Sequence, residues 1–219
     1  SFHAPGANSN AVKELVLASI LISARNIHSA IKYVDSVKDS DNLKKDIEEG
    51  KKAYVGFELP TKTLGVIGLG QIGVKVANAA HNLGMNVIGY DPLITVDNAI
   101  NLQPGVQKVN DLKELLNESN IITIHIPHKK ETENFVGENE IKQLNDGAII
   151  INLSREAIVD SSAVLKHLKP LKSKPTLQIS QWRNDQPQRC PCHASLRCIY
   201  KRGSNKLCCY GCKQHQIVS

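Results

Sequence analysis

The sequence predicts an α/β protein built on a doubly wound parallel sheet. A glycine-rich turn, Gly68 to Gly73, separates an apolar run from a segment with helical spacing of small and apolar residues. A second apolar run ends in Asp91, which completes a strand, turn, helix, strand and acid within one βαβ unit. Further apolar runs alternate with amphipathic segments, as expected for strands that helices cover on both faces.

Helical segments precede the glycine-rich turn. Asn10 is expected to cap the first helix. Residues 12–31 are expected to form one long, largely buried helix, and residues 38–52 a charged surface helix that ends around Gly50. We therefore expect residues 1–56 to be a crossover helix and a second helical segment that lead into the α/β unit.

Strands and helices continue to alternate after Asp91. Asp111 is expected to cap a short helix, and Ser161 a last one. Runs of continuous apolar residues predict the strands. The expected strands are residues 63–67, 86–90, 106–109, 120–126 and 148–153. We assign residues 57–169 to this single α/β domain.

The glycine-rich turn has the spacing of a dinucleotide-binding site. Gly68 permits the tight turn, Gly70 lets the backbone approach a pyrophosphate, and Gly73 lets the helix pack closely on the strand. Free N–H groups at the helix N-terminus then attract phosphate. Asp91, 18 residues after Gly73 and without an adjacent Arg or Lys, favours NAD over NADP. A turn whose glycines serve only the fold is the alternative.

Composition divides the chain near residue 170. Residues 170–219 contain nine of the 27 Lys and Arg, one of the 21 Asp and Glu, and all six cysteines. The net charge of +6 therefore arises in this tail and does not indicate nucleic-acid binding. No apolar stretch is long enough for a membrane span, and no signal peptide is recognisable. We expect a cytoplasmic protein without membrane or nucleic-acid partners.

Several motifs together resemble the NAD-dependent D-2-hydroxyacid dehydrogenases over residues 2–169. Besides the glycine-rich turn, the motifs are GANSNAVKEL from Gly6, Tyr90-Asp91-Pro92, His125-Ile126-Pro127, INLSR from Ile151 and Val159-Asp160. The resemblance implies a Rossmann NAD domain beside a substrate domain. It also implies that this chain starts at the crossover helix between the two domains, so we expect it to retain only a remnant of the substrate domain. It also implies that the crossover helix is buried at a dimer interface, so we expect a homodimer or a larger assembly.

The resemblance also implies the site residues. It assigns cofactor contacts to Gly68, Gly70, Gln71, Ile72, Gly73, Asp91, Ile126, Pro127, Leu153, Ser154 and Arg155. The turn would bind the pyrophosphate, Asp91 the adenine ribose, Ile126 and Pro127 the adenosine side, and the last three the nicotinamide. Arg155 matches the catalytic arginine, whose planar guanidinium can hold a carboxylate and polarise the adjacent carbonyl. Glu156 stands where the family usually has glycine, and a surface ion pair is the alternative role for Arg155.

The acid–base histidine of the family is missing from the sequence as written. Hydride transfer from C2 needs a base for the hydroxyl proton, and the family's histidine lies in a Pro-His-Leu-Gly-Ala-Ser context. Plausible codons for residues 190–201, read one base forward, give VLAMPHLGAST, and the same shift over residues 206–216 allows NCAVMAVNSIK. We therefore interpret residues 170–219 as an out-of-frame, unstructured tail without a metal. A cysteine-rich, metal-binding tail is the alternative.

The implied activity is the NAD-dependent oxidation of a small D-2-hydroxy acid. The closest resemblance is to the branch that acts on 3-phosphoglycerate in serine biosynthesis, and dehydrogenases of the glyoxylate or lactate type are the alternative. A non-catalytic NAD-binding protein with a cysteine-rich interaction tail is a second alternative. Because the histidine is missing, we expect the chain as written to bind NAD(H) without turnover.

Overall fold

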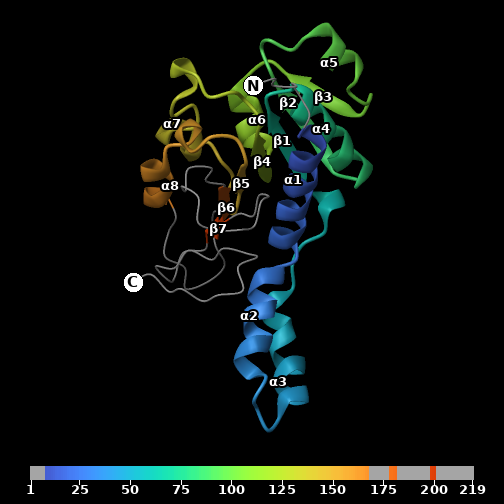
Figure 1. Ribbon diagram of the computed structural model, residues 1–219, viewed down its shortest axis with the longest axis vertical. Helices are drawn as coiled ribbons and strands as arrows, with labels where there is room; N and C mark the ends of the chain where they lie inside the picture. Colours follow the sequence, from blue (N-terminus) through green and yellow to red (C-terminus); the bar gives the residue numbers. More distant parts are fainter. Residues whose placement is uncertain (1–7, 168–177, 182–197, 201–219) are drawn as a thin grey trace.

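The computed structural model describes residues 8–167, 178–181 and 198–200 (Figure 1). Its strands form one seven-stranded sheet in the order β3-β2-β1-β4-β5-β6-β7, in which β7 alone runs antiparallel to its neighbour. The strands are β1 (Thr63–Ile67), β2 (Asn86–Tyr90), β3 (Val106–Val109), β4 (Ile121–Ile124), β5 (Ile149–Asn152), β6 (Gln178–Gln181) and β7 (Cys198–Tyr200). The α-helices are α1 (Ser9–Ala24), α2 (Ile27–Val37), α3 (Leu43–Gly50), α4 (Gln71–Asn82), α5 (Val96–Ile100), α6 (Leu112–Glu118), α7 (Glu138–Lys142) and α8 (Ser161–His167).

The sheet is doubly wound, as the sequence predicts. The chain builds β1, β2 and β3 outward in one direction, then returns to β4 beside β1 and continues outward the other way. Ile67 at the end of β1 lies between Tyr90 of β2 and Ile124 of β4. The carboxyl ends of three strands therefore meet where the order reverses, which is where ligands bind in open α/β sheets.

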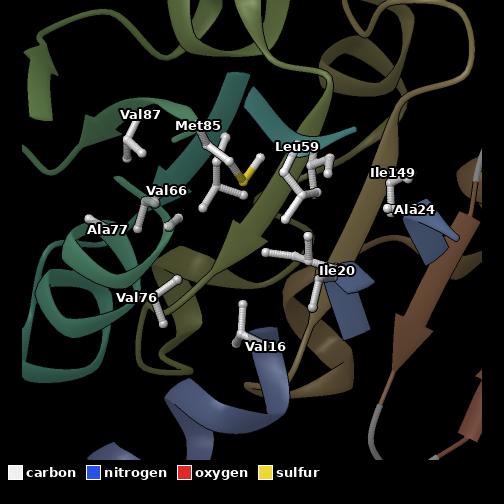
Figure 2. Packing of buried hydrophobic residues seen from close by; sticks show 14 of the residues in the cluster. Val16, Ile20, Ala24, Leu59, Val66, Val76, Ala77, Met85, Val87 and Ile149 are labelled. Carbon is white, nitrogen blue, oxygen red and sulfur yellow. The ribbon is translucent and has the colours of Figure 1, made fainter. Parts of the chain in front are cut away.

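Two hydrophobic clusters cover opposite faces of the sheet. Helices α1 and α4 pack on one face, where Ile20 of α1 joins Ile149 of β5 in one cluster (Figure 2). Helices α6, α7 and α8 supply the cluster on the other face. Ile150 belongs to that second cluster, while Ile149 and Ile151 belong to the first. Burial on both faces explains why β5 is a continuous apolar run.

The helix expected over residues 12–31 is two helices, so that prediction is wrong. Helix α1 ends at Ala24, and α2 begins at Ile27 after a bend of 58°. Asn26 adopts a left-handed conformation with a φ of 52°. The Ala24 carbonyl accepts a hydrogen bond from the N–H of Phe57 at 2.9 Å. The returning chain therefore supplies the hydrogen-bond donor for the Ala24 carbonyl that a continuing helix would otherwise supply, and the helix ends here.

Helices α2 and α3 extend away from the sheet as a hairpin (Figure 1). Helix α3 begins at Leu43, later than the predicted residue 38, but ends at Gly50 as the sequence predicts, and a 3₁₀ turn, Lys51–Tyr54, follows it. Tyr33 of α2 joins these parts, because its hydroxyl donates to the Asp46 carbonyl at 2.6 Å and its ring centre lies 5.4 Å from that of Tyr54. Neither helix of the hairpin contains a buried residue.

Two of the three expected helix caps differ from the structure. The Asp111 side chain accepts a hydrogen bond from a backbone N–H at 2.9 Å and caps α6, as predicted. Helix α1 starts at Ser9, so Asn10 lies inside the helix rather than at its cap. Asp160 replaces Ser161 as the cap of α8, because its carboxylate accepts hydrogen bonds from two N–H groups of the first turn.

Two short strands lie within the segment predicted to be an irregular tail. Strands β6 and β7 extend the sheet beyond β5. The rest of residues 170–219, with five of the six cysteines, lies outside the described residues. Within the described ranges, no single helix has the length and apolar character to cross a membrane, although α1 and α2 meet this test together as a bent pair.

Candidate functional site

The glycine-rich turn follows β1 and has the geometry that its spacing predicts. Gly68 has a φ of 91°, which favours glycine, and its N–H donates to the Tyr90 carbonyl at 2.8 Å. A Cβ on Gly68 would lie 2.8 Å from the carbonyl oxygen of His125. A side chain therefore does not fit between this turn and the end of β4.

Gly73 and Gly70 lie in different surroundings. A Cβ on Gly73 would lie 1.9 Å from the Gly68 carbonyl oxygen, so the absence of a side chain lets α4 start this close to the turn. A Cβ on Gly70, the N-cap residue of α4, would meet nothing within 4 Å. The first N–H groups of a helix, here those of Gln71 and Ile72, have no acceptor within the helix. This open space at a helix N-terminus fits the pyrophosphate of a dinucleotide.

Asp91 lies directly after β2, where backbone N–H groups fix its carboxylate. One oxygen accepts a hydrogen bond from the Leu69 N–H at 2.9 Å, and the other from the Leu93 N–H at 2.8 Å. The first of these bonds joins Asp91 to the glycine-rich turn. Each carboxylate oxygen keeps a further lone pair, so Asp91 can still accept hydrogen bonds from ribose hydroxyls.

His125, Ile126 and Pro127 follow β4, and the first two lie against the glycine-rich turn. The His125 N–H donates to the Ile67 carbonyl at 2.7 Å, and its ring Nε2 lies 2.9 Å from Thr123 Oγ1. Burial lowers the pKa of His125 to about 4, so its ring is neutral at neutral pH. A neutral ring bonded to its own strand fits a structural role at the end of β4.

The segment after β5 places Leu153, Ser154 and Arg155 beside the end of β4. Ser154 Oγ donates to the Ile124 carbonyl at 3.0 Å. Asn152, which is only 2% exposed, accepts a hydrogen bond from the Ser154 N–H and donates one to the Arg155 carbonyl, both at 3.0 Å. These bonds fix the backbone on which the exposed Arg155 side chain is carried.

The structure brings the predicted site residues together at one edge of the sheet. They follow the carboxyl ends of β1, β2, β4 and β5, which are neighbours in the sheet. Sequence reasoning missed Thr132 and Asn152, whose side chains hold two loops of this edge. Asn152 directly precedes the Leu153–Arg155 segment, and an Asn that opens a turn is a recognisable signal. Among the described residues, no group of three or more His, Cys, Asp or Glu side chains forms a possible metal site.

Comparison with known proteins identifies relatives of this chain. The family model described as the NAD-binding domain of D-isomer specific 2-hydroxyacid dehydrogenases matches residues 17–174. The D-3-phosphoglycerate dehydrogenase of Methanocaldococcus jannaschii is 39% identical over 167 residues, which are 76% of this chain and 30% of that protein. The glyoxylate reductase of Thermococcus litoralis is 36% identical over 165 residues, which are 75% of this chain and 48% of that protein.

Solved structures of similar fold are also D-2-hydroxyacid dehydrogenases. The D-lactate dehydrogenase of Aquifex aeolicus, complexed with NAD and lactic acid, has a TM-score of 0.63 at 31% identity, over 75% of this chain and 45% of that one. The D-lactate dehydrogenase of Escherichia coli has a TM-score of 0.63 at 30% identity, over 75% of this chain and 48% of that one. The chain spans less than half the length of these relatives. With this match and this site, the chain belongs to the D-isomer specific 2-hydroxyacid dehydrogenases and contains their NAD-binding domain.

Proposed function

We propose that the intact protein is an NAD-dependent dehydrogenase of D-2-hydroxy acids and that its substrate is 3-phosphoglycerate. The observation that carries the proposal is the exposed Arg155, on a segment whose backbone Asn152 and Ser154 fix beside the end of β4. The D-3-phosphoglycerate dehydrogenases among the relatives support the choice of substrate.

Each part of the cofactor would contact a different element. Bound NAD supplies the hydride acceptor. The N-terminus of α4 would hold its pyrophosphate, and the carboxylate of Asp91 would hold the adenine ribose. Ile126 and Pro127 would line the adenosine side, and Leu153 and Ser154 would lie by the nicotinamide. These contacts would place the nicotinamide beside Arg155.

Arg155 is the group that we propose binds the substrate. A 2-hydroxy acid has its carboxylate next to the reacting carbon, and a planar guanidinium can bind the carboxylate and the C2 oxygen together. The hydroxyl proton needs a base, and we propose a histidine encoded where residues 190–201 are read one base forward. The chain as written, without that histidine, would bind NADH without turnover.

A dehydrogenase of the glyoxylate or lactate type is the second candidate. The glyoxylate reductase and the D-lactate dehydrogenases among the similar proteins favour it. Both candidates use the same cofactor and the same arginine, so they differ only in the side chain that the substrate carries beside C2. A substrate panel therefore separates them, and cofactor binding does not.

We further propose that the intact enzyme is a cytoplasmic homodimer with α2 in the subunit interface. Ile27, Ile31 and Val34 of α2 are 39%, 48% and 44% exposed. Steps of four and three residues place these side chains on one face of the helix. An apolar stripe of this kind on a projecting hairpin is suited to burial against a second copy.

The test begins with the coding DNA. Resequencing from codon 160 to beyond codon 219 is expected to show a one- or two-base indel, and the corrected frame is expected to read through PHLGAS. The corrected protein is then assayed with 3-phosphoglycerate, glyoxylate and D-lactate by following NADH absorbance. Turnover of 3-phosphoglycerate supports the proposal, and turnover of glyoxylate or D-lactate alone replaces it with the second candidate. Turnover by the chain as written would contradict the need for the histidine.

A further inference from the structure

The hydroxyl group of Thr132 forms hydrogen bonds across the loop after β4, beside a backbone bond from the Thr132 N–H to the Lys129 carbonyl. Thr132 is the last residue of a 3₁₀ turn, Lys130–Thr132, five residues beyond Pro127. Its Oγ1 donates to the Pro127 carbonyl at 2.8 Å, with the Lys129 carbonyl at 3.1 Å as a second acceptor. The same oxygen accepts a hydrogen bond from the Lys129 N–H at 2.8 Å. The hydroxyl therefore joins both ends of the segment from 127 to 132.

The other side of this segment lies against the glycine-rich turn. A Cβ on Gly68 would lie 2.9 Å from Ile126 Cγ2, so Ile126 packs on the turn that is proposed to hold the pyrophosphate. Ile126 also packs against the hydrophobic cluster on the face of the sheet that α6, α7 and α8 cover. Pro127 has no N–H, so its carbonyl is the only backbone polar group through which it can be fixed. Thr132 supplies that bond.

We infer that Thr132 is a positioning residue for the adenosine half of the cofactor. It does not contact the cofactor itself, but holds Pro127 and Ile126 where they form an apolar wall next to the glycine-rich turn. The inference rests on the proposed function, because that proposal places the adenosine against Ile126 and Pro127. Loss of the hydroxyl would free the Pro127 carbonyl and let the wall move away from the turn.

The test compares Thr132→Val with Thr132→Ser in the full chain. Valine keeps the shape of threonine without the hydroxyl, and serine keeps the hydroxyl. Binding is measured for NADH by fluorescence and for AMP and nicotinamide mononucleotide by calorimetry. Thr132→Val is expected to weaken NADH and AMP binding by about fivefold to tenfold, the equivalent of one hydrogen bond. Thr132→Ser is expected to bind both as wild type does, and the mononucleotide to be unaffected by either change.

Thr61 provides a matched control. It is also the last residue of a 3₁₀ turn, Leu59–Thr61, and its hydroxyl donates to the Glu58 carbonyl at 3.1 Å. This turn precedes β1, at the opposite edge of the sheet from the site. Thr61→Val is therefore expected to leave AMP and NADH binding unchanged.

Three results would overturn the inference. Wild-type AMP affinity in Thr132→Val would show that the hydroxyl does not position the wall. Equal losses for AMP and the mononucleotide, or equal losses in Thr61→Val, would show a general loss of folding. A wild-type chain that binds neither NADH nor AMP would overturn the proposed function as well, whereas the first results leave that proposal standing.

Discussion

At the scale of single residues, Gly70 separates cofactor binding from folding. Its φ is −74°, which any residue adopts, and a Cβ there meets no atom within 4 Å. Gly70→Ala is expected to change the melting temperature by no more than about 2 °C. NADH binding is expected to weaken by about tenfold or more, because the methyl group would occupy the space proposed for the pyrophosphate. Thermal denaturation and NADH fluorescence titration measure the two effects.

Gly73→Ala is the control for Gly70→Ala. A Cβ on Gly73 would lie 1.9 Å from the Gly68 carbonyl oxygen, so this substitution is expected to lower the melting temperature and the NADH affinity together. If Gly70→Ala binds NADH as tightly as wild type does, the pyrophosphate does not lie at this position.

His125 makes the stability of the fold depend on pH. Burial lowers the pKa of its ring from 6.5 to about 4. Between these pH values the unfolded chain binds a proton at this ring that the folded chain does not, so the free energy of unfolding falls as the pH falls. His125→Gln removes this contribution and should flatten the curve by at most about 3 kcal/mol at pH 4. Urea denaturation from pH 7 to pH 4 measures it, and parallel curves for the two proteins would contradict the lowered pKa.

Residues whose role follows from local spacing could be predicted from the sequence, and residues that act across space could not. The turn glycines and Asp91 occupy fixed positions in one βαβ unit, and the structure gives them the expected surroundings. The role of Thr132 depends on the carbonyl of Pro127, five residues earlier in the loop after β4. Ser161 and Asp160 are adjacent and both residue types suit a helix cap, so the sequence alone does not show which of the two caps α8.

At the scale of elements, strands were predicted more reliably than the limits of helices. Continuous apolar runs follow from burial on both faces of the sheet, which is a property of the strand itself. The end of α1 at Ala24 is instead decided by a hydrogen bond from Phe57, more than thirty residues away in the chain. The apolar pattern continues through that point into α2, where Ile27, Ile31 and Val34 are exposed, so periodicity alone does not mark the break.

Helix α1 depends on the sheet for its stability, and Ile20 tests this. Ile20 is fully buried in the cluster that joins α1 to β5. Ile20→Ala is expected to lower the free energy of unfolding by about 2 to 5 kcal/mol, because it leaves a cavity under the helix. Leu21, the next residue, is 41% exposed, and Leu21→Ala is expected to cost less than about 1 kcal/mol. Equal losses in urea denaturation of the two variants would contradict this packing.

At the scale of the whole molecule, the sequence predicted the winding of the sheet but not the hairpin that leaves it. The alternation of strands and helices with a glycine-rich first turn leaves few possible topologies, because parallel strands need crossover connections of one hand. No such rule fixes the direction of the hairpin of α2 and α3, since neither of its helices contains a residue buried against the sheet. Its direction follows from the bend at Asn26.

The hairpin also gives the prediction for assembly. If α2 packs against a second copy, wild-type protein should have about twice the 24.0 kDa mass of the chain in light scattering. Ile31→Asp places a charge in the centre of the apolar stripe, and is expected to give the monomer mass while NADH binding is retained. Ile100 of α5 is 76% exposed and lies outside the hairpin, so Ile100→Asp should leave the mass unchanged. A monomeric wild type, or a dimeric Ile31→Asp, would show that another surface or none joins the subunits.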